Sequence, residues 1–462
     1  MVDYVIGAVV IGAAALAAGH AIVYKRDPRS ASLWVLVILL LPAAGPVLYA
    51  LFGVNRVQRR AARLRGTQPR RQPLPNLEQT LPGTQLAPLA RVIGAVAERP
   101  LVEGNAIEPL VDGREAYPAM LSAIEGARSS VALASYIFHG AGIGERFVLA
   151  LADAQRRGVA VRVLLDDVSD RFSWSSAAKK LRAAGVPVGV FNPTLVPARL
   201  HAMHLRNHRK ILVVDGAIAF TGGMNIDRRY WGEGACRDLH FRLRGPVVAQ
   251  LMEVFVEDWA FSTDEELRGA PWFCALENAG EVIARTVDAG PDESFERLRW
   301  AFIAGLNEAR RSVRLCTPYF IPDPALISEL NSAALRGVEV DIILPQTSDL
   351  PHVHWAAVHQ LWQVLEYGCR VWMRPGPFDH SKLMVVDAEW TLLGSGNWDA
   401  RSMRLNFELC VECYDRDLGG RMDALIRERR GQSRPVTLEA VNARPFPVKL
   451  RDGFARLFAP LL

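Results

Sequence analysis

Cysteine is scarce in this chain, and the few cysteines present follow no spacing pattern. Six cysteines are spread over 462 residues, which excludes a disulfide framework of the kind that small secreted domains require. Cys410 and Cys413 form the only close pair. Residues three apart on a strand point to opposite faces, so this pair is not expected to bind a metal or to act as a redox couple.

An excess of charge of one sign is also missing. The chain has 54 basic and 49 acidic residues, which gives a formal net charge of +5. This value is small for the length, so local clusters rather than total charge must identify an anionic partner. Nucleic acid is not an expected partner.

Charged side chains are absent from two long apolar segments near the amino terminus. Tyr4–Tyr24 contains one histidine and no charged residue, and Leu33–Phe52 contains no charge. As a helix, each segment is long enough to cross about 30 Å of hydrocarbon. The sequence therefore predicts two membrane spans. A cleaved signal peptide is the alternative for the first segment, but Asp3 and the lack of a basic residue before the segment argue against it.

The second apolar segment contains residues that interrupt helices. Trp34 and Tyr49 lie near its ends, where interfacial aromatic residues often occur. Pro42, Gly45 and Pro46 break its regularity, because proline cannot donate the hydrogen bond that a helix interior needs. We expect this segment to cross with a kink or to re-enter.

Acidic residues are missing from the segment that follows. Seven arginines lie between Arg56 and Arg71, and the first acidic residue after them is Glu78. Such a cluster favours the cytoplasmic side and an anionic lipid surface. A two-span hairpin would then leave the amino terminus and the rest of the chain in the cytoplasm. Three basic residues between the spans, Lys25, Arg26 and Arg29, weaken this orientation.

Composition divides the chain into five parts. The expected organisation is a transmembrane hairpin over 1–55, a basic and proline-rich linker over 56–100, two lobes over 101–285 and 286–440, and an amphipathic tail over 441–462. The tail interleaves basic and aromatic residues. Two placements remain open for it, on a membrane surface or against a lobe.

The strongest pattern that is present is a duplicated motif. His-x-Lys-x-x-x-x-Asp occurs at residues 208–215 and again at 380–387. In each copy, six residues separate the aspartate from a Gly-[Gly/Ser]-x-Asn sequence, which ends at Asn225 or Asn397. Two matches with the same extension indicate a repeated functional unit rather than chance.

The sequence around the motif is repeated as well. The aligned pairs are 124–131 with 306–313, 157–161 with 336–340, and 184–188 with 367–371. Each half reads as helix, strand, helix, strand, helix, strand and motif hairpin. The first apolar strand is expected over Val131–Phe138 in one half and Val313–Phe320 in the other. The predicted fold class is α/β, with two tandem lobes.

Strand periodicity separates the motif residues into two groups. Alternate residues on a strand share a face, so the histidine and lysine of each copy point one way and the aspartate points the other. We interpret the aspartates as structural or supporting groups, and Asp215-Gly216 is also a hairpin turn signal. The motif as a whole supplies the candidate catalytic residues, which are His208, Lys210, Asp215, His380, Lys382 and Asp387.

These residue types suit a tetrahedral phosphodiester. The lysines and the amides of Asn225 and Asn397 can hold the non-bridging oxygens, whose charge is redistributed in the transition state. One imidazole can attack phosphorus while the other protonates the leaving alkoxide, which requires no metal and no cofactor. The two halves must then meet at one site.

The duplicated motif closely resembles that of the phospholipase D superfamily, from about residue 100 to the end. The resemblance implies two α/β lobes related by a pseudo-twofold axis and a covalent phosphohistidine intermediate. It also implies that His208 attacks and that His380 acts first as acid and then as base. A carboxylate that orients a histidine is expected at Glu408 in the second half, and Asp238 is the looser match in the first.

The amino-terminal pattern from Trp34 to Gly53 resembles the membrane hairpin of bacterial cardiolipin synthases of the phospholipase D type. Residues 207–216, 317–323 and 401–408 resemble the same group. The resemblance implies transfer of a phosphatidyl group between two phosphatidylglycerol molecules with release of glycerol. Phospholipid substrates and a membrane are thus the expected partners, and the resemblance implies a multi-pass protein of the inner (plasma) membrane of a bacterium.

Three other functions remain open. A membrane phospholipase D would hydrolyse the same intermediate to phosphatidic acid, and a nuclease of the superfamily would need no membrane hairpin. A lipid-binding scaffold would not need both intact motifs. One departure from the resemblance is Asp379, which could raise the pKa of His380 through its charge or could point away from it.

Overall fold

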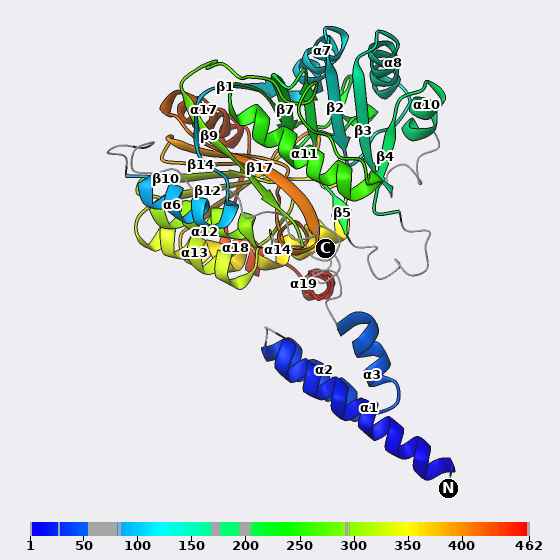
Figure 1. The fold of residues 1–462 in the computed structure, drawn as a ribbon. Coiled ribbons are helices and arrows are strands. Elements are labelled where there is room, and N and C mark those ends of the chain that lie inside the picture. The colour runs from blue at the N-terminus through cyan, green and yellow to red at the C-terminus, as the bar shows by residue number, and fades with distance from the viewer. Residues whose placement is uncertain are drawn as a thin grey trace.

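The computed structural model describes residues 2–25, 28–53, 81, 85–167, 176–193, 205–291, 294 and 296–459. The arginine-rich segment 56–71 and most of the proline-rich linker lie outside these ranges. The structure has two parts, the amino-terminal helices and the α/β region (Figure 1). The α/β region consists of the described residues from 85 to 459.

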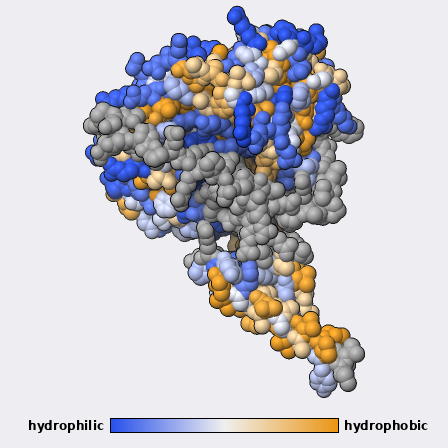
Figure 2. All heavy atoms as spheres, viewed as in Figure 1, coloured by the Kyte–Doolittle hydropathy of each residue, from blue (hydrophilic) through white to orange (hydrophobic). Residues whose placement is uncertain are grey.

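Helix α1 (Val2–Tyr24) has the length and composition of a membrane span. Its 23 residues extend about 34 Å at 1.5 Å per residue, enough for a hydrocarbon core of about 30 Å. Among the described residues it is the one helix that is long and apolar enough to cross a membrane. Figure 2 shows that hydrophobic residues dominate the visible surface of the amino-terminal helices, in contrast to the α/β region.

The second apolar segment does not form a continuous span. It is divided into α2 (Pro28–Leu40), α3 (Gly45–Leu48) and a short π-helix (Tyr49–Gly53). The chain bends sharply after Leu40, so that a Cβ on Gly45 would lie 2.6 Å from the Cα of Ile38. Tyr49 returns to the middle of α2, where its ring lies 5.4 Å from that of Trp34. The interrupting residues Pro42, Gly45 and Pro46 thus correspond to a fold-back.

The α/β region is built on a single long sheet. Its strand order is β18-β13-β12-β10-β14-β15-β17-β9-β1-β8-β7-β6-β2-β3-β4, with β5 beside β17. The strands are β1 (Val102–Val111), β2 (Ser130–Ser135), β3 (Ala160–Asp166), β4 (Val188–Phe191), β5 (Arg206–Asn207), β6 (Ile211–Val214), β7 (Ile218–Gly222), β8 (Leu239–Arg244), β9 (Val282–Ala289), β10 (Ser312–Cys316), β12 (Glu339–Pro345), β13 (Arg370–Arg374), β14 (Leu383–Val386), β15 (Trp390–Gly394), β17 (Asn406–Tyr414) and β18 (Arg434–Val436). A separate pair joins β11 (Phe320–Ile321) to β16 (Trp398–Asp399).

The strand order confirms the duplication. Outwards from the central antiparallel pair of β1 and β9, the order is β8-β7-β6-β2-β3-β4 in one half and β17-β15-β14-β10-β12-β13 in the other. Each of these strands therefore has an equivalent across a pseudo-twofold axis, whereas β18 and β5 have none among the described residues. The strands β2 and β10 end earlier than expected, because the chain after Ser135 and Cys316 leaves the sheet.

Helices cover both faces of the sheet. On one face lie α7 (Asp112–Glu125), α8 (Ile143–Arg156) and α10 (Ala177–Ala183) in the first half, and α6 (Ala87–Ala97), α12 (Arg297–Glu308), α13 (Pro324–Leu335) and α15 (Trp362–Leu365) in the second. The long helices α11 (Val247–Thr263) and α17 (Arg416–Gly431) pack into a core on the other face, which both halves share. The remaining helices are α14 (Pro351–Gln360), α16 (Ala400–Arg404), α18 (Leu438–Asn442) and α19 (Phe446–Arg456).

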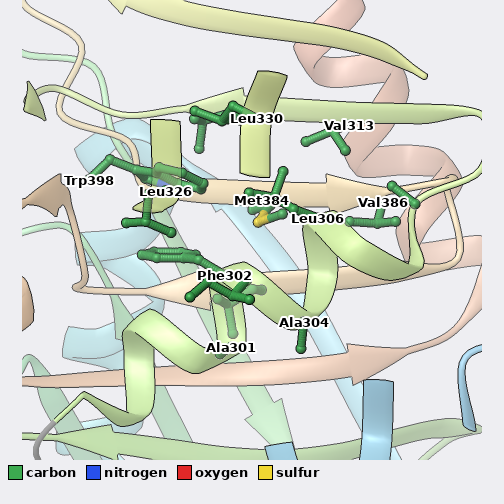
Figure 3. Close-up of a cluster of buried hydrophobic side chains, with 14 of the residues drawn as sticks. Ala301, Phe302, Ala304, Leu306, Val313, Leu326, Leu330, Met384, Val386 and Trp398 are labelled. Carbon is green, nitrogen blue, oxygen red and sulfur yellow. The ribbon is translucent and has the colours of Figure 1, made fainter. Parts of the chain in front are cut away.

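Core packing fixes the segments that follow the motifs. Trp398 is buried beside Asn397, and its ring stacks on Phe302 of α12 at 4.3 Å (Figure 3). Cys410 and Cys413 of β17 belong to cores on opposite faces of the sheet, which confirms the expectation that they do not face each other. Their thiol pKa values are raised by burial.

The motif hairpins carry tight turns. Asp215 and Gly216 have φ values of +53° and +64°, and Asp387 and Ala388 have +54° and +56°. Two consecutive positive φ angles are the geometry that matches the twist of a two-residue hairpin. The predicted turn at Asp215-Gly216 is therefore confirmed.

Candidate active site

The two motif copies meet at one cavity. His208 and His380 lie on the segments that lead into β6 and β14, and both line a cavity of about 420 Å³ together with Asn225 and Asn397. The cavity is thus assembled from equivalent residues of both halves, as the duplicated motif predicts.

Each histidine is paired with a carboxylate from the opposite half. Nδ1 of His208 lies 2.9 Å from Oε2 of Glu408, and Nδ1 of His380 lies 2.9 Å from Oδ2 of Asp238. Both expected carboxylates therefore contact histidines, and the pairing crosses between lobes. Because Nδ1 is occupied in each ring, Nε2 is the nitrogen left for chemistry.

Glu408 is surrounded by hydrogen-bond donors. Its carboxylate accepts bonds from Ser395 Oγ at 2.6 Å, Ser402 Oγ at 2.8 Å and Asn406 Nδ2 at 3.1 Å, besides the bond to His208. Burial alone would raise its pKa, but the charge and hydrogen bond of His208 and the neighbouring donors lower the pKa to about 2. Glu408 is therefore ionised and holds the proton of His208 on Nδ1.

Asp238 has a poorer set of partners. Apart from His380, its carboxylate accepts a bond from the backbone N–H of Leu239 at 2.7 Å. The position equivalent to Ser395 is Gly223, where a Cβ would lie only 2.4 Å from Asp238 Oδ1. Burial raises the pKa of Asp238 to about 8, against the opposing charge of Lys382. Glu408 is therefore ionised at neutral pH, whereas Asp238 keeps its proton up to about pH 8.

Both histidines are neutral at neutral pH, and the two pairs differ in the protonation of the carboxyl group. Burial lowers the pKa of His208 to about 4 despite the charge of Glu408, so its Nε2 carries a lone pair at neutral pH. Burial also lowers the pKa of His380 well below its usual value, while the pKa of Asp238 is raised. At neutral pH the His380–Asp238 pair therefore holds one more proton than the His208–Glu408 pair.

The two lysines are buried behind the histidines. Lys210 Nζ donates to the backbone oxygen of His208 at 2.6 Å, and Lys382 Nζ donates to that of His380 at 2.5 Å. Burial lowers the pKa of Lys210 to about 7 and that of Lys382 to about 8. An ammonium group has three donors, so each lysine can keep this bond and still bind an anionic oxygen.

The asparagines are held in place by their neighbours. Asn225 Oδ1 accepts the backbone N–H of Ile137 at 3.2 Å, and the backbone N–H of Asn397 donates to Ser402 Oγ at 3.2 Å. Asn397 Oδ1 is buried without a hydrogen-bond partner among the described residues. Both amides line the cavity, where they can bind a polar substrate group.

The motif aspartates lie elsewhere. Asp215 accepts backbone N–H groups of residues 128, 129 and 130, and Asp387 accepts those of residues 310, 311 and 312. Neither lines the cavity. Their grouping with the catalytic residues is therefore corrected, and their interpretation as structural groups agrees with the geometry. Each one fixes the start of a central strand, β2 or β10.

Removal of an aspartate from a motif should therefore affect stability more than catalysis. The Asp387→Ala variant loses the three charge-assisted bonds that its buried carboxylate accepts from the backbone of residues 310–312, which should cost about 3 kcal/mol of unfolding free energy. The measurement is the unfolding temperature in detergent, together with kcat per folded molecule. An unchanged unfolding temperature with kcat abolished would contradict the structural role.

Several cavity residues had no signal in the motif. Tyr230 lies with its hydroxyl 3.1 Å from His380 Nδ1. Arg229 and Asp349 form an ion pair at 3.5 Å, and Tyr319 donates to Asp349 at 2.7 Å. Their loops come together only in the folded chain. The cavity is also lined by Tyr136, Ile137, Leu350, His352, Val353, Asp399, Arg401 and Asn406.

Asp379 does not contact His380. Its carboxylate pairs with Arg374, lies 3.4 Å from Arg429 and accepts the backbone N–H of Ser381 at 3.1 Å. Burial would raise its pKa, but the two arginines hold it below its usual value. Of the two alternatives for Asp379, the geometry favours a residue that points away from the histidine. His201 and His204, which precede the first motif, lie outside the described residues.

Comparisons with known proteins agree with the duplicated site. Residues 120–259 and 302–429 match a family model described as "Cardiolipin synthase, PLD-like domain", and residues 12–53 match one described as "Phospholipase_D-nuclease N-terminal". The chain is 31% identical over 460 residues to the major cardiolipin synthase of Bacillus subtilis, with 95% of each chain covered. It is 30% identical over 451 residues to a cardiolipin synthase of Geobacillus kaustophilus, with 95% of this chain and 90% of the relative covered.

A solved structure shares the fold. The crystal structure of phosphatidylserine synthase from Haemophilus influenzae superposes with a TM-score of 0.66 at 16% identity, and the match covers 81% of this chain and all of that one. At this identity the likeness concerns the fold alone.

Proposed function

Because the chain belongs to the cardiolipin synthase family of phospholipase D-like proteins, we propose that it transfers a phosphatidyl group from one phosphatidylglycerol to a hydroxyl of another, releasing glycerol. The single observation that carries the chemistry is the pair of histidines in one cavity, each bound to a carboxylate of the other lobe. The names of the relatives, which match over almost the whole chain, support cardiolipin as the product, and phosphatidylglycerol as donor and acceptor is part of the proposal.

The first half-reaction uses the difference between the two histidines. Nε2 of His208 attacks phosphorus, a P–N bond forms, and the P–O bond to the glycerol headgroup breaks. The leaving oxygen takes the proton that the His380–Asp238 pair holds. Glu408 stabilises the positive charge that develops on the His208 ring, because it is ionised and bonded to Nδ1.

The second half-reaction reverses these roles. After glycerol leaves, a hydroxyl of a second phosphatidylglycerol gives its proton to His380 and its oxygen attacks phosphorus. The P–N bond breaks, which regenerates neutral His208 and yields cardiolipin. The amides of Asn225 and Asn397, which line the cavity, contact the phosphate in both steps. Lys210 and Lys382, which lie buried behind the histidines and do not line the cavity, attract it through their charge.

Product analysis tests this function. Purified enzyme in mixed micelles would receive phosphatidylglycerol labelled in one acyl chain and in the glycerol headgroup, with the His208→Ala variant in parallel. The proposal predicts acyl label in cardiolipin and headgroup label in free glycerol from the unmodified enzyme. Phosphatidic acid as the main product would instead make the enzyme a hydrolase, since water can open the same intermediate.

The pH profile should report the buried groups. Lys210 and Lys382 have lowered pKa values of about 7 and 8, so each is charged below its pKa and loses that charge above it. The pair of Asp238 and His380 loses its proton near pH 8. We therefore expect kcat/KM for phosphatidylglycerol to fall as the pH rises through this range, and to fall at low pH only near 4, where His208 is protonated. A level profile from pH 6 to 9 would contradict these assignments.

The chain is membrane-associated, and we propose that α1 crosses the bilayer while α2 and α3 re-enter. The fold-back of α3 would leave both ends of the α2–α3 segment on one side of the membrane. The arginine cluster over 56–71 favours the cytoplasm as that side. The α/β region is then cytoplasmic, and the amino terminus lies outside. This differs from two full spans, which would put the amino terminus in the cytoplasm.

Cysteine labelling distinguishes these orientations. In sealed right-side-out membranes, an impermeant maleimide should label a Tyr4→Cys variant, while the exposed Cys274 of the α/β region should react only after permeabilisation. Two full spans predict that both positions are protected until the membrane is opened. Reaction of Cys274 in sealed membranes would place the α/β region outside.

A further inference from the structure

Helix α19 attaches to the α/β region through one face only. Its residues Asp452 and Ala455 are buried, and Ala455 packs in a small core with Val353 and Ala356 of α14. The guanidinium of Arg451 lies 4.4 Å from the centre of the Trp355 ring, also on α14. The tail therefore packs against a lobe, which was one of the two placements left open by the sequence.

The opposite face of α19 is apolar and exposed. Positions 446, 450 and 454 succeed one another at intervals of four residues and so share one side of α19, and residues 457 and 458 follow directly after its last residue, Arg456. They hold Phe446, Leu450, Phe454 and Phe458, whose exposed fractions lie between 47% and 75%, and Leu457 beside them is 73% exposed. An apolar stripe of this size on a surface requires an occupant.

Charge on α19 indicates what that occupant is. Lys449 and Arg456 flank the stripe on one side, and Arg451 flanks it on the other, as their helical positions require. The one acidic residue of the helix, Asp452, is buried and paired with Arg444 at 2.6 Å and with Arg451 at 2.7 Å. Basic side chains bordering a stripe of phenylalanine and leucine are typical of a helix that lies in the surface of an anionic bilayer.

We propose that α19 lies in the interface of an anionic phospholipid bilayer, with its phenylalanine and leucine stripe among the acyl chains and its basic residues at the lipid phosphates. The placement of α19 agrees with this, because it lies on the side of the α/β region nearest the membrane helices α1, α2 and α3 (Figure 1). A second copy of the chain would also cover an apolar stripe, but would not account for basic residues on both of its borders.

The position of α14 gives the docking a functional consequence. The loop before α14 and its first turn supply Asp349, Leu350, His352 and Val353 to the wall of the cavity. A membrane held by α19 is thus one helix away from the catalytic cavity, so a lipid phosphate reaches the histidines while its acyl chains stay in the bilayer. This consequence rests on the proposed function in taking the substrate to be a bilayer lipid, whereas the docking itself does not.

A probe on the stripe tests the docking without requiring turnover. The full chain with Cys236→Ser and Cys274→Ser would carry Leu450→Cys labelled with an environment-sensitive fluorophore. The matched control is Leu149→Cys on α8, which is similarly exposed, 59% against 62%, and lies far from the membrane helices. Both proteins would be placed in nanodiscs of phosphatidylglycerol and phosphatidylethanolamine, with and without spin-labelled acyl chains.

The proposal predicts quenching by the spin-labelled lipid at position 450 at least twofold greater than at position 149. Equal quenching at the two positions would overturn it. A blue-shifted probe without lipid quenching, together with cross-linked dimers, would assign the stripe to a second copy and would also overturn it. None of these outcomes depends on which reaction the enzyme catalyses.

An activity measurement tests whether membrane docking by α19 supplies lipid to the cavity. Leu450→Asp combined with Phe454→Asp should reduce the rate on phosphatidylglycerol vesicles about tenfold and raise the ratio of the rate on dispersed short-chain lipid to the rate on vesicles. Leu149→Asp, matched in exposure, should leave that ratio unchanged. An unchanged ratio in the double variant would contradict the link between docking and lipid supply.

Discussion

The His208→Ala variant is expected to lose phosphatidyl transfer by roughly 10⁵-fold or more, the scale seen when a covalent nucleophile is removed. The imidazole of His208 lines the cavity, and its Nδ1 is bonded to an ionised carboxylate. Its Nε2 is therefore a neutral nucleophile at physiological pH. His380 is also paired with a carboxylate, but burial raises the pKa of its partner Asp238 to about 8, so we assign the acid role to that pair and the attack to His208. The measurement is kcat for cardiolipin formation.

A matched histidine provides the control. His139 belongs to the same lobe and also pairs with a carboxylate, Asp227 at 3.2 Å, but it does not line the cavity. His139→Ala should retain most of the activity. If His208→Ala and His139→Ala had similar activities, the nucleophile would have to be sought elsewhere.

The Glu408→Gln variant should lower kcat by about 10³- to 10⁴-fold while the lipid still binds, by analogy with the loss of the buried carboxylate from a catalytic triad. Ionised Glu408 accepts the proton of His208 Nδ1 and so leaves the Nε2 lone pair toward the cavity. The carboxamide can instead donate to Nδ1, which moves the ring proton to Nε2. The histidine then occupies the same place in the wrong tautomer. The separate values of kcat and KM test this, because a change of tautomer affects kcat.

Glu412 of the same strand is the matched control for Glu408. It is equally buried, and it pairs with Arg285 rather than with a histidine. Glu412→Gln should lower the unfolding temperature, because it leaves the buried arginine less well paired, while kcat per folded molecule stays near that of the unmodified enzyme. An equal loss of kcat in both variants would mean that Glu408 acts through stability alone.

Much of the site could be predicted because the motif is repeated. Two copies of a pattern with period-two spacing identify the histidines and lysines, and the alignment of the halves gives the order of helices and strands. The separation of the aspartates from the catalytic face also followed from strand periodicity. Glu408 and Asp238 could be identified only through the family resemblance, because no local pattern marks a lone carboxylate as the partner of a histidine.

The crossed pairing of carboxylates and histidines could not be predicted from either half alone. Which histidine Glu408 contacts depends on how the lobes meet across β1 and β9, and this is a tertiary property. The contrast between Ser395 and Gly223 was present in the motif, but its meaning emerged only with the distances to Glu408 and Asp238. The contributions of Tyr230 and Asp349 arise from loops whose positions no periodicity fixes.

The second apolar segment shows a different limit of sequence reasoning. A segment of twenty uncharged residues has the same hydropathy and length whether it crosses a bilayer or folds back within it, so these two properties do not distinguish the two structures. Pro42, Gly45 and Pro46 indicated an interruption but not its angle. The ring contact between Tyr49 and Trp34 shows that the segment folds back on α2.

The covalent intermediate is the central claim, and its direct detection is the decisive measurement. The His380→Ala variant would be mixed with a phosphatidyl ester that has a good leaving group, so that the first step needs no acid while the second lacks its base. Digestion and mass spectrometry would then locate the lipid. The account predicts a phosphatidyl adduct on His208. An adduct on another residue, or none when the leaving group is released in a stoichiometric burst, would contradict it.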